Sequence, residues 1–261
     1  MYRLPCKGRV LEKLSDNQFK KYCVLVYREA GINLTDEKRE LLNARLAKRL
    51  RKLDIDAKQY YERVNADPDE LRIFLDAIST NHTFFFREAR SFQYLDTGPK
   101  DIWCAASSSG EEPYSLAAYC LDKGFAPSIL ATDIAVTCLE KARQAVYPAQ
   151  AVTNIPKHML KTYFQKGQGK WDGYIRVKPT VQRLISFERF NLLKDPPPNK
   201  TFDMVFCRNV MIYFDTPTKE FVVDKLCRSL RDGGHFIIGG AESLSGLNHP
   251  LKYVEPSVYR K

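Results

Sequence analysis

The chain has 261 residues, enough for one large α/β domain and a smaller module. Its net charge of +10 suggests an acidic partner, although a basic surface that only aids solubility is compatible with the same number. No apolar run approaches the ~18 residues of a membrane span, and the start MYRLPCKGRVLEKL lacks the apolar segment of a secretion signal. Direct membrane insertion is therefore excluded, and a cytoplasmic protein is expected.

Cysteine and histidine usage predicts neither disulfides nor a metal site. The seven cysteines are scattered without CxxC spacing, and most lie in apolar runs, where a free thiol behaves as a small buried hydrophobe. A reducing compartment fits this pattern. The four histidines show no spacing typical of metal ligands.

Residues 1–78 predict a helical domain. Apolar residues recur at spacings of three and four across 19–27, and Gly31 ends that helix. Further helices are expected with Thr35 as N-cap, across 56–64, and from Pro68 toward residue 78. On the second helix a basic stripe lies beside a leucine stripe, and it is either a solvated face or a docking surface for an acidic helix. The basic stripe consists of Arg45, Lys48, Arg49 and Lys52.

Residues 79–261 predict an α/β domain, entered through a linker over 79–100. Runs of strand length alternate with helical patterns, as in a parallel sheet. The turn at 232–234 is expected to lead into the fifth strand. Five strands are expected at 102–106, 129–134, 184–189, 204–207 and 235–239, a last one near 257–260, and helices at 114–122, 137–144 and 219–230. The Gly-rich stretch 166–179 predicts an insertion, about 156–183, that carries its own small sheet.

The most informative stretch is IWCAASSSGEEPYS, residues 102–115. An apolar run, a turn of small residues and the start of a helix form the unit that holds nucleotide-like ligands at the carboxyl edge of a parallel sheet. Phosphate-binding loops leave backbone N–H groups facing an anion, whereas here Glu111 and Glu112 follow the turn. Carboxylates suit a ligand with hydroxyls or a positive charge, and S-adenosylmethionine has both. The missing GxGxxG argues against a dehydrogenase.

Other strand ends carry further candidates. Asp133 follows the turn at about the interval at which an acid binds ribose hydroxyls, although capping of the next helix is an alternative. Asn191 and Leu192 leave the third strand where an adenine would lie. Arg208 and Asn209 end the strand from Met204, and Tyr213 follows them as either a site residue or a core tyrosine.

The segment TNHTFFFRE, residues 80–88, joins three phenylalanines to polar side chains. The three phenylalanines are explained if they form a hydrophobic staple, that is, if they pack so as to attach the helical module to the α/β domain. Such a staple explains Asn81, Thr83 and Arg87 poorly.

Taken together, TNHTFFFREA, AASSSGEEPYSLA, ATDI, FCRNVMIYFD and GGHFIIGGAESL resemble the CheR family of chemotaxis receptor methyltransferases. The match covers most of the chain. The resemblance implies a Rossmann-like S-adenosylmethionine-dependent methyltransferase sheet with a small N-terminal all-helical domain and a small β-subdomain insertion. It also implies a protein-glutamate O-methyltransferase that esterifies glutamates on chemoreceptor signalling helices in sensory adaptation, with S-adenosylhomocysteine as product. A monomer is expected.

The resemblance also implies site residues. Arg87 and Tyr213 match the residues expected near the transferred methyl group and are the predicted catalytic residues. The spacing of Gly167, Gly169 and Gly173 is similar to that of members whose β-subdomain binds a peptide at the receptor's C-terminus. The family's cofactor contacts fall on Asn81, Thr83, Arg87, Glu112, Asp133, Asn191, Leu192, Arg208 and Asn209.

Three alternatives stay open at this point. A related protein methyltransferase of another signalling array would carry the same motifs. A nucleic-acid methyltransferase would use the basic charge but needs a base pocket with stacking aromatics, so no nucleic acid is expected. A cofactor-sensing module without catalysis is disfavoured because both Arg87 and Tyr213 are present.

Overall fold

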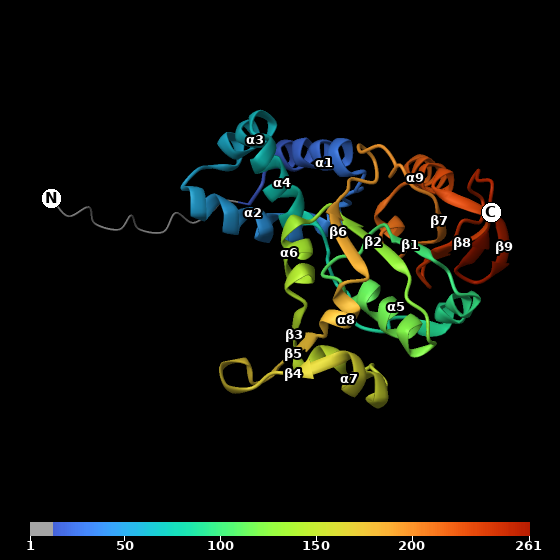
Figure 1. The fold of residues 1–261 in the computed structure, drawn as a ribbon. Helices are drawn as coiled ribbons and strands as arrows, with labels where there is room; N and C mark the ends of the chain where they lie inside the picture. Colours follow the sequence, from blue (N-terminus) through green and yellow to red (C-terminus); the bar gives the residue numbers. More distant parts are fainter. Residues whose placement is uncertain (1–12) are drawn as a thin grey trace. The chain divides into compact units, whose positions relative to one another are not determined.

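The computed structural model describes residues 13–261, and the chain divides into two compact units after Ser79. The predicted boundary lies one residue earlier. The first unit is all-helical (Figure 1). Its helices are α1 (Asp16–Ala30), α2 (Arg39–Leu53), α3 (Ala57–Ala66) and α4 (Pro68–Ile78), with a short 3-10 helix η1 (Asp36–Lys38) before α2.

Local signals explain where these helices begin and end. Gly31 ends α1 in the left-handed conformation, with φ of 68°. Asp56 forms a capping box with Gln59 at the start of α3, and Asp67 caps α4 with Pro68 in its first turn. Thr35 precedes η1 rather than α2 and makes no side-chain cap bond, so the predicted N-cap is displaced by one short helix.

The second unit contains a seven-stranded sheet in the order β6-β2-β1-β7-β8-β10-β9. The first five strands in this order are parallel, and β10 and β9 are antiparallel. The predicted parallel sheet is therefore confirmed. Its strands are β1 (Asp101–Cys104), β2 (Ser128–Asp133), β6 (Ile185–Arg189), β7 (Phe202–Cys207), β8 (Leu230–Ile238), β9 (Lys252–Glu255) and β10 (Val258–Arg260).

The expected turn at 232–234 lies inside β8. The strand begins at Leu230 and runs through the two glycines, with a register shift against β7 between Phe202 and Met204. Gly233 has φ of 79°, and its N–H donates to the Lys261 carbonyl at 2.9 Å. The glycines form an irregularity in a continuous strand, paired with the end of the chain, rather than a loop.

The helices of the second unit follow the strands as predicted, and each begins one to three residues before its predicted range. They are α5 (Glu111–Asp122), α6 (Val136–Gln144) and α9 (Thr216–Arg228), and a 3-10 helix η2 (Ala89–Thr97) lies within the predicted linker. Helix α5 begins three residues before the predicted range because its two glutamates fill the first turn, where carboxylates are favoured. Gly110 before it has φ of 94°, and an added Cβ would lie 2.8 Å from the Ala142 Cβ.

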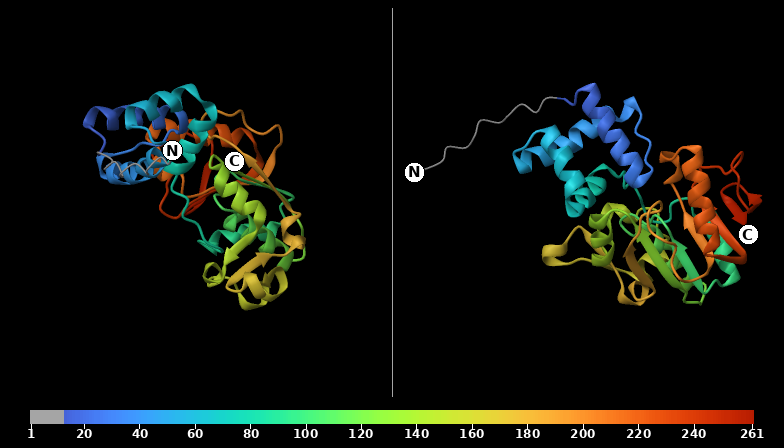
Figure 2. Two further views of the ribbon diagram at one scale, coloured as in Figure 1. Left: turned by 90° about the vertical axis from the view of Figure 1, so that its left-hand side faces the viewer. Right: turned by 90° about the horizontal axis from the view of Figure 1, so that it is seen from above.

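The predicted insertion with its own sheet is present, and its sheet begins earlier than the predicted range. The three strands are antiparallel in the order β3-β5-β4, and the β4–β5 loop projects away from the main sheet (Figures 1 and 2). Its elements are β3 (Val146–Pro148), η3 (Ala149–Val152), α7 (Lys157–Tyr163), β4 (Phe164–Lys166), η4 (Gly169–Trp171), β5 (Tyr174–Val177) and α8 (Pro179–Gln182).

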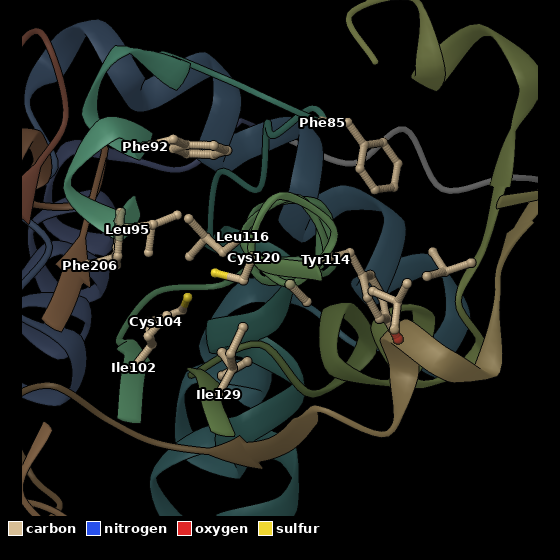
Figure 3. Close-up of a cluster of buried hydrophobic side chains, with 14 of the residues drawn as sticks. Phe85, Phe92, Leu95, Ile102, Cys104, Tyr114, Leu116, Cys120, Ile129 and Phe206 are labelled. Atoms are coloured by element: carbon tan, nitrogen blue, oxygen red, sulfur yellow. The ribbon is translucent and has the colours of Figure 1, made fainter. Parts of the chain in front are cut away.

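A buried cluster joins the two sheets of this unit (Figure 3). Phe85 is fully buried and packs edge-on against Tyr147 at 4.9 Å and Phe164 at 5.3 Å between ring centroids. In Figure 3 Cys104 of β1 and Cys120 of α5 point into the space between strand and helix. Phe85 therefore packs inside the second unit. The sequence had instead suggested that the three phenylalanines attach the helical module to the α/β domain.

The six cysteines within residues 13–261 are free thiols, and five are buried; Cys6 lies outside the described residues. In the same range no group of three His, Cys, Asp or Glu side chains gathers as a metal site would require. No described helix has both the length and the apolar character needed to cross a bilayer.

Candidate functional site

The strand order brings most of the predicted site residues to one edge of the main sheet. Strands β6, β2, β1 and β7 are neighbours and parallel, so their carboxyl ends lie side by side. Asp133 ends β2, Arg208 follows β7 directly, and Asn191 lies just beyond β6. The turn between β1 and α5 lies at the same edge.

Asp133 organises that turn. Its Oδ2 accepts the Ser108 N–H at 2.7 Å, and its Oδ1 accepts the Ala135 N–H at 2.9 Å at the start of α6. The side chain thus joins the turn to Ala135, the residue that precedes α6. Ser108 has a left-handed φ of 47°, and its hydroxyl donates to the Asn81 carbonyl at 3.2 Å. The segment 80–88 is thereby tied to the turn.

Glu111 and Ser107 provide polar groups inside the same region. The Ser109 hydroxyl donates to Glu111 Oε2 at 2.8 Å, and burial raises the pKa of this carboxyl. The Ser107 side chain is buried, and its Oγ has no hydrogen-bond partner within residues 13–261. A buried hydroxyl without a partner is costly unless a ligand or water completes it.

Arg208 stands at the centre of a buried charge cluster. Its Nη1 donates to Glu112 Oε1 at 2.6 Å, and its Nη2 donates to the Arg87 carbonyl at 2.7 Å and to Glu88 Oε2 at 2.9 Å. Only 3% of its side chain is exposed. Burial raises the pKa of Glu112, whereas at Glu88 bonds from Arg208 and Gly240 outweigh burial and lower the pKa. The two carboxylates keep the guanidinium charged.

The cluster includes a residue that the sequence reasoning did not assign. Glu88 also accepts the Gly240 N–H at 2.8 Å and the Asn209 Nδ2 at 3.4 Å. It therefore connects the segment 80–88 to the ends of β7 and β8. Its backbone is left-handed, with φ of 49°. Glu88 lies within the motif TNHTFFFRE, but nothing in its local pattern indicates contacts with residues 120 and 152 positions away.

Arg87 and Thr83 flank this cluster. Arg87 donates from Nη1 to the His82 carbonyl at 3.0 Å and lies with its guanidinium carbon 5.6 Å from the Phe84 ring centroid. A quarter of its side chain is exposed, in contrast to Arg208. Its Nε lies 3.7 Å from Glu88 Oε1, so this partly exposed side chain borders the Arg208 cluster. Thr83 is half-buried.

The turn after β7 carries Asn209 and Tyr213. Asn209 has a left-handed φ of 58°, and Tyr213 closes the 3-10 helix η5 (Met211–Tyr213) and is half-buried. Glu242, a second residue that the sequence reasoning did not assign, accepts four backbone N–H groups around this turn. It belongs to the motif GGAESL, but only the three-dimensional structure relates it to β7.

Asn191 and Leu192 form the remaining side of the predicted site. The Asn191 Oδ1 accepts the Leu193 N–H at 2.9 Å and the Lys194 N–H at 3.3 Å, so the side chain folds over its own turn. Both residues are buried. Their predicted contact with an adenine stays a prediction.

Two members of the basic stripe on α2 are used inside the helical unit. Arg45 donates from Nη1 to the Ala77 carbonyl at 3.0 Å, to the Ser79 carbonyl at 2.6 Å and to the Ile78 carbonyl, at the end of α4. Arg49 forms a two-bond pair with Glu70, at 2.7 and 2.6 Å. Lys48 and Lys52 are exposed. The stripe is thus divided into two structural arginines and two solvent-facing lysines.

The three glycines of the β-subdomain shape the loop between β4 and β5. Gly169 and Gly173 have positive φ, and the Gly167 N–H donates to the Tyr174 carbonyl at 2.8 Å. Trp171 and Tyr174 are exposed on this loop and pack edge-on, with ring centroids 6.1 Å apart.

The donor set of the sheet edge fits S-adenosylmethionine. An acid ends β2 where a ribose is bound in nucleotide folds, and Glu111 and Glu112 fill the first turn of α5. The Ser107 Oγ and the Arg208 Nε are buried polar atoms without partners within residues 13–261. The assignment of Asn81, Thr83, Glu112, Asp133 and Asn209 to the cofactor stays a prediction.

Comparison with known proteins agrees with this geometry. The family domain described as "CheR methyltransferase, SAM binding domain" matches residues 81–260, and "CheR methyltransferase, all-alpha domain" matches residues 17–79. The chain is 37% identical to the chemotaxis protein methyltransferase of Salmonella typhimurium over 94% of this chain and 90% of that protein. It is 36% identical to the chemotaxis protein methyltransferase of Escherichia coli, over 94% of this chain and 91% of that protein.

A solved structure of the glycopeptide N-methyltransferase MtfA complexed with sinefungin is a distant match. It aligns at a TM-score of 0.40 and 15% identity, covering 69% of this chain and 59% of that one.

Proposed function

Because the chain belongs to the CheR methyltransferase family and is an S-adenosylmethionine-dependent methyltransferase, we propose that it methylates glutamate side chains of chemoreceptors. The acceptors would be glutamates on the receptors' cytoplasmic signalling helices, and the product would be glutamate methyl esters. The enzyme would work as a cytoplasmic monomer. The structural observation that carries the proposal is the edge of the main sheet, where Asp133, Glu112 and the Arg208 cluster gather around the β1–α5 turn.

The chemistry proposed here needs no general base. A glutamate with a pKa of about 4.3 is ionised at neutral pH, so its oxygen is already a nucleophile. When bound, S-adenosylmethionine supplies an electrophilic methyl group on a positively charged sulfur. The protein's contribution is to place the two reactants in line and to exclude water, and placement alone can contribute ~7–11 kcal/mol.

Arg87 and Tyr213 are the residues that we assign to the reacting groups. Arg87 is partly exposed and charged, so it can orient the incoming carboxylate. Tyr213 lies on η5, directly after the turn held by Glu242. We propose that the Tyr213 hydroxyl lies against the sulfonium of the bound cofactor, in the methyl-transfer region.

Substrate docking is assigned to α2. Arg45 and Arg49 are bonded within the helical unit, so Lys48 and Lys52 are the members of the basic stripe that remain exposed for an acidic receptor helix. A peptide at the receptor's C-terminus is the second proposed contact. The exposed Trp171 and Tyr174, on the loop shaped by Gly167, Gly169 and Gly173, are where such a peptide would be held.

The test is a methylation assay with radiolabelled S-adenosylmethionine and purified chemoreceptor cytoplasmic domains. We expect label that alkali releases as methanol, because carboxyl methyl esters are base-labile. Tyr213→Phe is the control for the site and should retain the fold while losing activity. Alkali-stable label would indicate N- or S-methylation, and label on RNA in place of receptor would overturn the proposal.

A further inference from the structure

Glu242 lies outside the set of residues assigned to the cofactor or the acceptor. We infer that it is a positioning residue of the methyltransferase, which sets the turn from Asn209 to Tyr213. The inference rests on the proposed function for its catalytic consequence, but its structural part concerns this chain alone.

The carboxylate of Glu242 gathers four backbone donors from two strand ends. Its Oε1 accepts the Met211 N–H at 2.7 Å and the Ile212 N–H at 3.3 Å. Its Oε2 accepts the Asn209 N–H at 2.9 Å and the Gly239 N–H at 2.6 Å. Hydrogen bonds to an ionised acceptor are roughly twice as strong as neutral ones. The end of β8 and the turn after β7 are thus joined through one side chain.

Two local backbone bonds support the end of the turn, from the Tyr213 N–H to the Val210 carbonyl at 3.2 Å and from the Phe214 N–H to the Met211 carbonyl at 3.1 Å. The residue before η5 is Val210, which makes no cap bond, so the first N–H groups of η5 depend on Glu242. Asn209 holds a left-handed conformation that a non-glycine residue rarely adopts. A Cβ added to Gly239 would collide with the Asn209 amide, so Asn209 lies directly against the β8 end.

The position of this turn matters for catalysis because the turn carries Asn209 and Tyr213. Asn209 is a predicted cofactor contact, and its Nδ2 also donates to Glu88 at 3.4 Å. Met211 is buried and Ile212 is half exposed, so the turn fixes which side chains face the core and which face outward. Tyr213 follows at once. A turn that relaxed by a few tenths of an ångström would move both assigned residues together.

A purely structural role is the alternative. Such a role would lower the stability of the whole unit and leave the site intact in the molecules that stay folded. A positioning role instead loosens residues 209–213 and lowers the rate of methyl transfer in a folded protein. Catalysis is sensitive to displacements of this size because the reactants must lie in line.

The experiment compares Glu242→Gln with Glu140→Gln, an identical change at an exposed residue of α6. Amide hydrogen exchange is followed in the full chain without cofactor. We expect the Asn209, Met211 and Ile212 amides to exchange about tenfold faster in E242Q, with the amides of β1 unchanged. We expect kcat to fall about tenfold or more while the KM for receptor changes less than about threefold.

Glu242→Asp keeps the charge on a shorter side chain and serves as the second variant if E242Q does not fold. It should show a smaller increase in exchange at the same amides and a correspondingly smaller loss of kcat. Unchanged exchange in both variants, or a uniform increase that includes β1, would overturn the inference. If the wild-type protein methylates no receptor, the proposed function fails, and the exchange measurement still decides the structural part.

Discussion

Arg208 and Glu112 are joined by a 2.6 Å hydrogen bond between the end of β7 and the first turn of α5. Both side chains are almost fully buried, at 3% and 10% exposure. Burying two charges costs several kcal/mol each, and the pair compensates only because Glu88 and the Arg87 carbonyl complete the guanidinium's bonds. The relationship therefore depends on three segments that are far apart in the sequence.

Removing the charge of Arg208 and removing the charge of Glu112 should lower the free energy of unfolding by different amounts. Arg208→Met leaves two carboxylates without their cation and should lower the free energy of unfolding by about 3–5 kcal/mol. Glu112→Gln leaves Arg208 paired with Glu88 and should cost about 1–2 kcal/mol. Urea unfolding followed by circular dichroism measures both. Equal losses would show that Glu88 does not share the charge.

Asp133→Asn should separate ligand binding from folding. The amide keeps one oxygen, which can still accept either the Ser108 or the Ala135 N–H, so we expect a stability loss of about 1–2 kcal/mol. The affinity for S-adenosylhomocysteine should fall about tenfold or more, because an ionised acceptor for the ribose hydroxyls is lost. Titration calorimetry on the folded variant gives the answer. Unchanged affinity would exclude Asp133 from the cofactor site.

The strands of the main sheet other than β9, and the residues at the ends of its parallel strands, could be predicted from the sequence. Apolar runs of strand length alternate with helices, and such a pattern has few solutions other than a parallel sheet. Once the sheet is parallel, polar residues after its strands must share one edge, which explains why Asp133, Asn191 and Arg208 were found. The extra residues of β8 were missed because Gly233 and Gly234 have the composition of a turn, and their pairing with Lys261 is long-range.

Glu88 and Glu242 could not be predicted, for a different physical reason. Both carboxylates accept N–H groups from distant backbone, and backbone donors carry no side-chain signal. The arginines of α2 show the converse difficulty. A basic stripe has the same sequence whether it faces solvent or, as Arg45 does, the carbonyls at the end of a neighbouring helix.

The Arg49–Glu70 pair predicts a pH dependence for the helical unit. Bonds from Arg49 and Tyr60 lower the pKa of Glu70, which is 2% exposed. A carboxyl whose pKa is lower in the folded state stabilises the fold above its unfolded pKa of about 4.3, and this contribution is lost as the pH falls through the folded pKa. Glu70→Gln should therefore be less stable than wild type by about 2–3 kcal/mol at pH 7.

The difference between wild type and E70Q should narrow as the pH is lowered from about 5 toward 3. Denaturant unfolding at several pH values measures it, with fluorescence or circular dichroism as the signal. The other carboxyls titrate in both proteins, so the difference in unfolding free energy between wild type and E70Q reports the contribution of Glu70 alone. A difference that stays constant with pH would mean that folding does not lower the pKa of Glu70.

Receptor docking can be tested by charge reversal at the two exposed lysines of α2. Lys48→Glu with Lys52→Glu should raise the KM for receptor about tenfold, because attraction to an acidic helix becomes repulsion, while the affinity for cofactor stays the same. The control is the same reversal at Lys20 and Lys21, which are exposed on α1 of the same unit. The effect should weaken at high salt, since exposed charges are screened. An equal rise in KM for both double variants would indicate a response to net charge alone and would remove α2 from the docking surface.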